Sequence, residues 1–232
     1  IIGYAELLVD EMEDDGHDAY IKDAESIRSA GRHLLSLISD ILATTMLDTG
    51  RLQLRVERFA LADLVAELLP MIRPALRERG NAFHLEVDPE LVDATLDSDA
   101  SKLRQILVNL LGNAAKFTEG GDVTLRVEAR GERRICFSVV DTGIGVAPEL
   151  QENIWREFVQ ADDSSTRVHG GIGLGLALVK RLTTLLGGEV TLDSEVGRGA
   201  TFRVVIPRVL SSAADARRED DDPERLVATR PE

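Results

Sequence analysis

The stretch Ile106-Leu107-Val108-Asn109-Leu110-Leu111-Gly112-Asn113-Ala114-Ala115-Lys116 decides the fold of this chain. It is an apolar helical segment in which Asn109 and Asn113 lie four residues apart, so both amides and the Lys116 ammonium can share one helical face. Polar amides inside a core-like helix are destabilising unless a partner satisfies them. An amide oxygen is a hard ligand that suits Mg²⁺, and a lysine suits phosphate. This helical face is therefore the first candidate for a binding site.

Two glycine-containing motifs follow downstream. Asp141-Thr142-Gly143-Ile144-Gly145 ends an apolar strand pattern, and Gly170-Gly171-Ile172-Gly173-Leu174-Gly175-Leu176 opens a helical one. The Asp141 carboxylate can accept a hydrogen bond from the exocyclic amine of adenine, whereas guanine presents a carbonyl at the matching position. Gly143 and Gly145 let the backbone bend and approach a ring closely. Without its context, this first motif is equally well explained as a strand that ends in a turn.

The second motif differs from two common phosphate loops in its spacing. Gly171-x-Gly173-x-Gly175 is not the G-x-G-x-x-G of dinucleotide folds, and no Gly-Lys-Ser/Thr follows, as a P-loop requires. The first free N–H groups of the helix predicted over residues 174–186 can still receive phosphate oxygens. An aspartic protease is a further reading of Asp141-Thr142-Gly143, but that chemistry needs two carboxylates and the sequence has no second copy.

The order and spacing of the three motifs resemble the ATP-binding domain of sensor histidine kinases, where they are the N, G1 and G2 boxes of the GHKL nucleotide-binding superfamily. The resemblance implies ATP and Mg²⁺ as cofactors, with Asn113 holding the metal, Lys116 neutralising phosphate charge and Asn109 orienting the site. Asn109 and Lys116 are then the catalytic residues. The implied nucleotide-binding residues are Asn109, Asn113, Lys116, Asp141, Gly143, Gly145, Arg167, Gly171, Gly173, Gly175, Leu176 and Thr201.

The polar segment 158–169 resembles the mobile lid that covers ATP in this family. Arg167 is a candidate contact for the terminal phosphates, because guanidinium is a planar cation with several donors; a solvated arginine is the alternative. Ile172 stands where the family often has Thr or Ser, which implies that a hydroxyl contact is missing and that lid closure is weaker.

Two further segments carry the same resemblance. Ile154, Trp155 and Phe158 are similar to the F box at the base of the lid, although core packing explains them equally well. Residues 197–202 look like the last motif of the family, whose threonine lies near the adenine. The resemblance therefore implies that Thr201 is a contact in the surroundings of the nucleotide.

Composition and charge narrow the class of protein. The chain has 232 residues and a mass of 25.4 kDa, and 44% of its residues are hydrophobic, enough for a folded core. Its formal net charge of -14 argues against a general nucleic-acid surface. No apolar run approaches the roughly 20 residues that cross a bilayer, so we expect a cytoplasmic chain whose membrane anchor, if any, lies outside it. The single Cys136 is expected to be a small buried apolar residue.

Residues 1–49 are predicted to form a helical hairpin. Ile1, Ala5, Leu8 and Met12 recur at helical spacing, and a similar pattern continues from residue 24 to residue 41. Two amphipathic helices cannot bury their own apolar stripes, so we expect a homodimer that completes a four-helix bundle. The hairpin is similar to the dimerisation and histidine-phosphotransfer module of the same kinases; a coiled coil without chemistry is the alternative.

The remaining chain is predicted to contain an ATP-binding domain over residues 50–209 and a disordered acidic tail or linker over residues 210–232. Strands are expected at 52–56, 83–87, 123–127, 135–140, 190–192 and 202–206, and helices at 61–79, 101–117 and 174–186. Pro70 and Pro74 are expected to break or kink the first of these helices. The fold class is therefore α+β: a helical hairpin that forms a dimeric four-helix bundle, followed by a GHKL-type α/β sandwich with a largely antiparallel sheet.

The expected reaction follows from the residue at position 109. Related ATPases carry a glutamate there to activate water, and an amide cannot act as that base, so we expect slow hydrolysis. The resemblance implies transfer of the γ-phosphoryl group to a histidine, and onward to an aspartate of a response-regulator receiver domain. Two other functions stay open: a catalytically silent ATP-binding dimerisation module and a GHKL ATPase.

The acceptor histidine of the family would precede Ile1. His17, His33, His84 and His169 do not have the surroundings of an acceptor. We therefore expect an N-terminally truncated kinase core that does not phosphorylate itself, and an upstream sensor domain in the native protein.

Overall fold

The computed structural model describes residues 53–157, 159 and 173–210, together with isolated helical positions between residues 3 and 34. The chain divides into two compact units, one of residues 1–53 with 153–178 and one of residues 54–152 with 179–232. Most of the predicted hairpin, nearly all of the predicted lid and residues 211–232 of the predicted tail lie outside the described residues. The predicted domain boundaries and the disorder of the tail therefore stay predictions.

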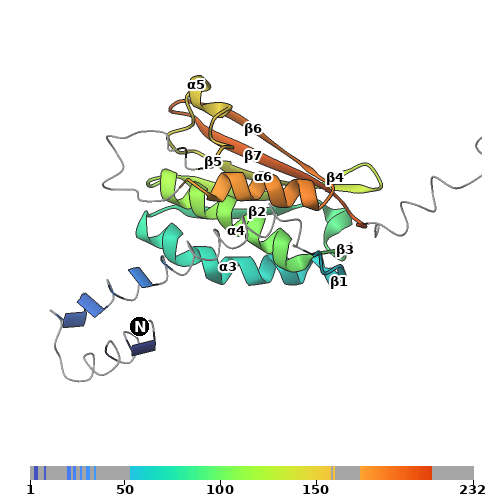
Figure 1. Ribbon diagram of the computed structural model, residues 1–232, viewed down its shortest axis with the longest axis horizontal. Helices are drawn as coiled ribbons and strands as arrows, with labels where there is room; N and C mark the ends of the chain where they lie inside the picture. Colours follow the sequence, from blue (N-terminus) through green and yellow to red (C-terminus); the bar gives the residue numbers. More distant parts are fainter. Residues whose placement is uncertain are drawn as a thin grey trace, which may run out of the picture. The chain divides into compact units, whose positions relative to one another are not determined.

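The larger unit contains a five-stranded mixed sheet (Figure 1). Its strands are β2 (Ala82–Val87), β4 (Asp122–Arg130), β5 (Arg134–Asp141), β6 (Glu189–Glu195) and β7 (Gly199–Pro207), in the order β2-β4-β5-β7-β6. Only β2 and β4 run parallel, and the other neighbours are antiparallel. The expectation of a largely antiparallel sheet is confirmed, and every strand predicted from residue 83 onward is present with longer bounds.

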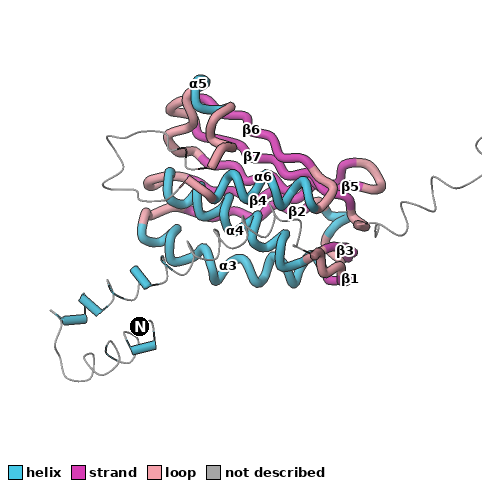
Figure 2. The backbone as a smooth tube through the Cα atoms, in the orientation of Figure 1, coloured by secondary structure: helices cyan, strands magenta, loops and turns pink. Residues whose placement is uncertain are grey.

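Helices cover one face of this sheet, as the side-on views in Figures 1 and 2 show. They are α3 (Leu61–Glu78), α4 (Ala100–Phe117) and the part of α6 (Gly175–Leu185) that belongs to this unit; α5 (Pro148–Gln151) and the 3₁₀ helix η1 (Pro89–Leu91) are single turns. The core-facing residues of α4 are fully buried, as are those of the central strands. They include Leu103, Ile106, Leu107, Leu110 and Leu111 on α4, Val123 and Val127 on β4, Phe137 and Val139 on β5, and Val204 and Ile206 on β7.

Of the prediction that Pro70 and Pro74 break or kink the first long helix, the break is wrong. Both prolines lie inside a continuous α3 of 18 residues. They are exposed, and so is Ala66, the residue four positions before Pro70. The carbonyls left without an N–H partner therefore face water, which can satisfy them. The opposite side of the helix is buried at positions such as Leu68 and Ile72, and this packing holds the helix together.

A second, two-stranded sheet lies beside the first helix of the unit. The antiparallel strands are β1 (Glu57–Ala60) and β3 (Thr95–Ser98). The strand predicted over residues 52–56 is wrong for its described residues 53–56, which lie outside any strand, because β1 begins only at Glu57. β3 was not predicted. Leu210 extends the arrangement, because its N–H donates to the Asp97 carbonyl at 2.7 Å.

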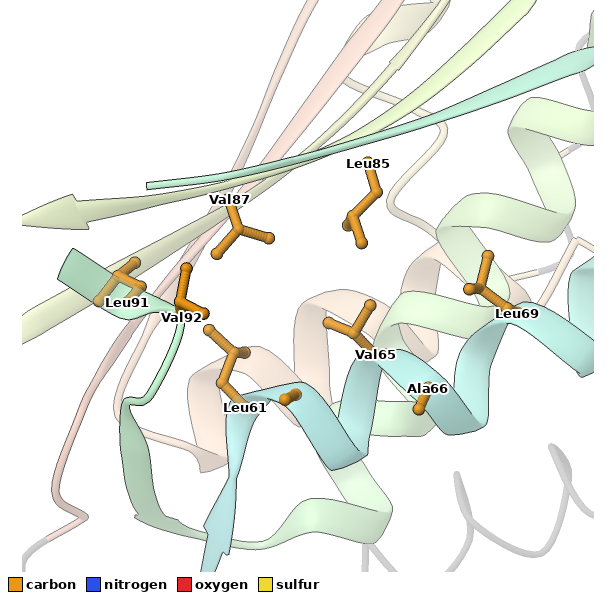
Figure 3. Close-up of a pocket in the computed structure, with 9 residues that line it drawn as sticks. Leu61, Val65, Ala66, Leu69, Leu85, Val87, Leu91 and Val92 are labelled. Atoms are coloured by element: carbon orange, nitrogen blue, oxygen red, sulfur yellow. The ribbon is translucent and has the colours of Figure 1, made fainter. Parts of the chain in front are cut away.

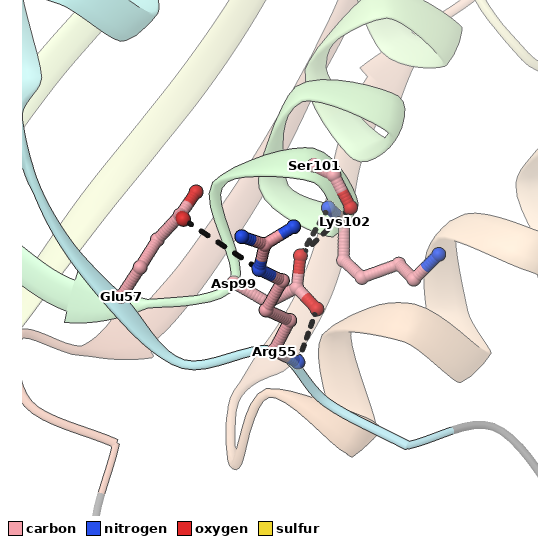
Figure 4. A network of polar contacts seen from close by, with 5 residues as sticks. All are labelled: Arg55, Glu57, Asp99, Ser101 and Lys102. Carbon is pink, nitrogen blue, oxygen red and sulfur yellow. Dashed lines mark hydrogen bonds and ion pairs between the residues drawn. The ribbon is translucent and has the colours of Figure 1, made fainter.

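The start of α4 is fixed by Asp99, a buried N-cap residue (Figure 4). Its Oδ1 accepts hydrogen bonds from the Ser101 hydroxyl at 2.8 Å and from the Lys102 N–H at 3.1 Å. Its Oδ2 accepts from the Arg55 N–H at 2.9 Å. One carboxylate thus satisfies a free N–H group of the helix and joins the helix to the segment that precedes β1.

In the smaller unit, the described positions between residues 3 and 34 are helical. Three of them, Tyr20, Ile27 and Leu34, follow one another at seven-residue intervals and are exposed at 60%, 51% and 57%. Within one continuous helix, apolar residues at this interval would lie along one side, and we refer to these three residues as the seam.

None of the described helices combines the length and the apolar composition that a membrane-spanning helix requires.

Candidate nucleotide site

The candidate site is built on the half-buried face of α4. Asn109, Asn113 and Lys116 are all partly exposed, while the residues between them that face the core are buried. The Asn109 side chain donates from Nδ2 to the Gln105 carbonyl at 3.1 Å, which leaves its Oδ1 for another partner. Asn113 has no hydrogen-bond partner within the described part of the chain. The helix thus presents two amide oxygens and one ammonium along a single face, as the sequence predicts.

Lys116 stands at the last turn of this helix. Its Nζ lies 4.9 Å from the centroid of the Phe117 ring, within the range of a cation–π contact. Partial burial lowers the pKa of Lys116, and the positive charge of Arg79 lowers it further. A partly desolvated ammonium with a second cation nearby favours the binding of an anion. The anion offsets both the lost hydration of the ammonium and its repulsion by the second cation.

Asp141 ends β5 and is only 7% exposed. Its Oδ1 accepts hydrogen bonds from the Gly143 N–H at 2.9 Å and from the Ala200 N–H at 3.3 Å. Burial raises the pKa of Asp141, and these two backbone donors act against the rise. Oδ2 accepts no hydrogen bond from the described residues. The carboxylate is therefore oriented by the backbone through one oxygen and available through the other.

The loop after β5 is tied to the end of α4. The Ile144 N–H donates to the Phe117 carbonyl at 3.2 Å. A Cβ at Gly143 would collide with that carbonyl, so only glycine allows this approach. Gly145 has φ +69, and a Cβ there would meet the Glu195 carbonyl. Both predicted glycines are thus required by contacts, and the contact at Gly143 brings the Asp141 motif next to the Lys116 end of the helix.

Two residues that the sequence did not single out shape this loop. Ser194 on β6 accepts the Val146 N–H at 2.9 Å and donates to the Gly199 carbonyl at 2.8 Å. Gln151 donates from Nε2 to the Val146 and Ser194 carbonyls, each at 3.0 Å. Neither residue carries a signal in the sequence, because a serine in an alternating strand and a glutamine after a proline are typical surface residues.

The structure does not place Thr201 on the side of the sheet where Asp141 lies. Asp141 pairs with Ala200 across the β5–β7 ladder, and Thr201 pairs with Val140. Since successive side chains of a strand point to opposite faces, Ala200 shares the helix-covered face with Asp141 and Thr201 points to the other face. Within the last motif, Ala200 is the residue that contacts Asp141, through its backbone N–H.

The glycine-rich motif is only partly described. Arg167, Gly171 and Ile172 lie outside the described residues, as does Phe158. Gly173 has φ +75, and Gly175 and Leu176 begin α6. These three residues belong to the smaller unit, whereas Asp141 belongs to the larger one. Their part in nucleotide binding stays a prediction.

The side-chain amide oxygens on α4 suit a magnesium ion that also takes ligands from phosphate. No group of three or more His, Cys, Asp or Glu side chains that could hold a metal occurs in the described part of the chain. A hard cation bound there would take its remaining ligands from the nucleotide and water, as Mg²⁺ commonly does. The half-buried amide of Asn113, which has no partner among the described residues, is the group suited to this ion.

A separate apolar hollow of about 300 Å³ lies between α3 and β2 (Figure 3). It is lined by Leu61, Ala62, Val65, Ala66, Leu69, Leu85, Val87, Leu91 and Val92. None of the predicted site residues lines it, and its side chains offer no hydrogen-bonding group for a base or a phosphate. The hollow is therefore distinct from the candidate nucleotide site.

Comparison with known proteins links this site to one family of ATPases. Residues 98–210 match the family described as histidine kinase-, DNA gyrase B-, and HSP90-like ATPase. The circadian input-output histidine kinase CikA of Synechococcus elongatus is 44% identical over 192 residues, which cover 81% of this chain and 24% of that protein. The sensor histidine kinase AruS of Pseudomonas aeruginosa is 38% identical over 195 residues, which cover 82% of this chain and 19% of that protein.

A solved structure supports the same relationship. Full-length ShkA in complex with AMPPNP superposes with a TM-score of 0.70 at 36% identity, over 83% of this chain and 39% of that chain. The chain thus spans about a quarter or less of the length of the two curated relatives and less than half of this structure. The predicted GHKL-type α/β fold is confirmed for the larger unit, whereas the dimeric bundle is not tested.

Proposed function

Because residues 98–210 belong to the family of histidine kinase-, DNA gyrase B- and HSP90-like ATPases, we propose that this chain is the ATP-binding and phosphoryl-transfer core of a protein-histidine kinase in a two-component system. The observation that carries the proposal is Asp141. It is a buried carboxylate with one oxygen fixed by two backbone donors and the other available, and its loop is joined to the Lys116 end of α4.

Each part of the nucleotide would meet a different group. The free oxygen of Asp141 accepts from the exocyclic amine of adenine, which selects ATP over GTP. Lys116 neutralises phosphate charge, and its pKa-lowering environment favours the anion. Asn113 would hold Mg²⁺, which when bound reduces the charge on the phosphate oxygens. Arg167 and the motif from Gly171 to Leu176 would complete the phosphate end.

The amide at position 109 favours transfer of the γ-phosphoryl group over hydrolysis of ATP. An amide cannot take a proton from water, and its Nδ2 is already bound to the Gln105 carbonyl. The remaining oxygen can orient the site without activating a nucleophile, so transfer rests on positioning and electrostatic stabilisation. The acceptor would be a histidine, and the phosphoryl group would pass on to an aspartate of a response-regulator receiver domain. We also propose a homodimer formed through the helical hairpin and an upstream sensor domain.

Calorimetric titration of the whole chain with Mg-AMPPNP tests the nucleotide site. We expect binding by the wild type and a loss of at least about tenfold in affinity for Asp141→Asn, because the amide presents a donor or a weaker acceptor to adenine. Asp99→Asn is a matched control, since Asp99 is an equally buried acid that accepts backbone N–H groups at the other end of α4. Equal affinity of the wild type and Asp141→Asn would contradict the site.

Transfer is tested with γ-labelled ATP and a protein that carries an acceptor histidine. We expect an acid-labile, base-stable label on that protein, which Asn109→Ala removes while Mg-AMPPNP still binds. Steady release of phosphate without any acceptor would instead identify an ATPase. Binding without transfer would identify a catalytically silent module.

A further inference from the structure

Asn81 lies in the turn between α3 and β2, outside every motif of the site. Its Nδ2 donates to the Ala115 carbonyl and to the Thr118 carbonyl, each at 2.9 Å. Its Oδ1 accepts the Gly121 N–H at 3.2 Å. One half-buried side chain therefore binds the last turn of α4 and the turn that leads into β4.

The two carbonyls that Asn81 binds stand on either side of Lys116 and Phe117 in the chain. Carbonyls of the last helical turn have no partner within their own helix, so their position is set by whatever binds them from outside. Asn81 is itself held, because its N–H donates to the Leu76 carbonyl at 2.9 Å. The end of α4 is thus attached to the end of α3 through one amide.

The same end of α4 is also hydrogen-bonded to the loop that follows Asp141. Phe117 accepts the Ile144 N–H, between the two carbonyls that Asn81 binds. The attachments of Asn81 and of the Asp141 loop therefore fall within the four consecutive residues 115–118, at the end of α4. A displacement of this point moves Lys116 and Asn113 with respect to Asp141, whose own contacts are to Gly143 and Ala200.

We infer that Asn81 is a positioning residue for the phosphate end of the nucleotide site, an inference that rests on the proposed nucleotide binding. Its bonds to the Ala115 and Thr118 carbonyls hold the Lys116 turn of α4 against the Asp141 loop. At the adenine end, the Asp141 carboxylate is oriented by the Gly143 and Ala200 N–H groups, neither of which Asn81 binds. Loss of Asn81 therefore weakens the binding of phosphate groups more than the binding of the base.

The test compares two ligands on the whole chain: Mg-ATP, which uses both ends of the site, and adenosine, which uses only the base end. For Asn81→Ala we expect the Kd of Mg-ATP to rise about tenfold, the order of effect for a lost buried donor, and the Kd of adenosine to change less than about twofold. Asn81→Asp keeps the size and the acceptor oxygen but presents a carboxylate to two carbonyls. We expect it to weaken Mg-ATP binding at least as much.

Asp88→Ala is the matched control. Asn81 directly precedes β2, and Asp88 directly follows it. The Oδ2 of Asp88 accepts the Ala129 N–H at 2.9 Å, so this side chain too links β2 to the neighbouring strand. It lies at the opposite end of β2 and β4 from the site. We expect it to lower the melting temperature without changing the ratio of the two Kd values. If the ratio of the Kd of Mg-ATP to the Kd of adenosine is the same in Asn81→Ala and Asp88→Ala, the positioning role is overturned.

A measurement on the wild type covers the case in which Asn81→Ala does not fold. The side-chain amide protons of Asn81 should shift in a ¹⁵N-resolved spectrum on addition of Mg-AMPPNP and stay in place on addition of adenosine. Shifts that are equal with both ligands, or absent with both, overturn the inference while the nucleotide site stands. Failure of the wild type to bind Mg-ATP overturns the site and the inference together.

Discussion

The Asp141 carboxylate is held in an environment that disfavours its charge. Burial raises its pKa, and the hydrogen bonds from Gly143 and Ala200 compensate only in part. An uncharged group of the same shape would suit the folded chain better. The stability of the fold therefore does not explain this acid, which is the pattern expected of a binding residue.

Asp141→Asn should accordingly stabilise the folded chain at neutral pH while it weakens nucleotide binding. The wild-type carboxyl has a higher pKa in the folded state than its ordinary 3.8, so as pH rises the unfolded chain releases this proton first. The contribution of the group to stability therefore falls as pH rises from 3.8 through the raised pKa. We expect the variant to be more stable than the wild type at neutral pH and to lose this part of the pH dependence.

Urea denaturation from acid to neutral pH, without nucleotide, measures both effects. Ser138→Ala is a suitable control, since Ser138 is a buried polar residue of the same strand that does not titrate. A variant that is less stable than the wild type throughout would contradict the assignment of burial as the dominant cause of the pKa shift.

At the scale of elements, α4 depends on its two ends for different reasons. Asp99 holds the first turn through two hydrogen bonds and links it to Arg55 through a third, and Asn81 holds the last turn. Only the last turn carries Lys116. The beginning of the helix should therefore matter for stability and the end for the ligand.

Asp99→Ala tests the first half of this statement. We expect the free energy of unfolding to fall by about 1–2 kcal/mol, because an N-cap bond and a link to the Arg55 N–H are lost together. Mg-AMPPNP affinity of the folded variant should stay within about twofold of the wild type. Chemical denaturation and calorimetry on the same preparation measure the two quantities. A tenfold loss of affinity would show that the two helix ends are not independent.

Elements with a strong apolar period could be predicted from the sequence, and the others could not. The helix 101–117 and the strands of the large sheet carry such a period, and each is present. β3 has one buried apolar residue, Leu96, and no alternation to signal it. The prolines of α3 gave a local signal that tertiary packing overrides, because the sequence does not show that their face is exposed.

The residues of the candidate site also differ in whether the sequence alone predicts them. Asn109, Asn113, Lys116 and Asp141 stand out because polar groups interrupt apolar patterns, and the structure places them on one unit of the chain. Which of two neighbouring residues, Ala200 or Thr201, faces Asp141 depends on the register of β7 with β5, and a single sequence does not contain that register. The role of Asn81 is equally invisible, since its partners lie more than 30 positions away.

At the scale of the whole molecule, the exposed seam of Tyr20, Ile27 and Leu34 bears on the proposed homodimer. A single chain leaves these side chains in water, and a second copy would cover them. The reaction core and the dimer contacts would then belong to different units of the chain.

Ile27→Glu should consequently convert a dimer into a monomer. A charge in the middle of an apolar seam cannot be buried without a partner, so association is lost. Sedimentation equilibrium should give about twice the chain mass of 25.4 kDa for the wild type and the chain mass for the variant. Val196→Glu is the control, because Val196 is also an exposed apolar residue, at 61%, but lies in the turn between β6 and β7. A wild type that sediments as a monomer would contradict the four-helix bundle.

The single sulfhydryl of the chain has a practical consequence. Cys136 is in the central strand with none of its surface accessible, and it is the only cysteine in the sequence. Thiol reagents should leave the native protein unmodified and react when β5 separates from its neighbours, so alkylation rates report global opening. A cysteine introduced at a surface position such as Ile144 could then carry a maleimide dye selectively, without prior removal of the native thiol.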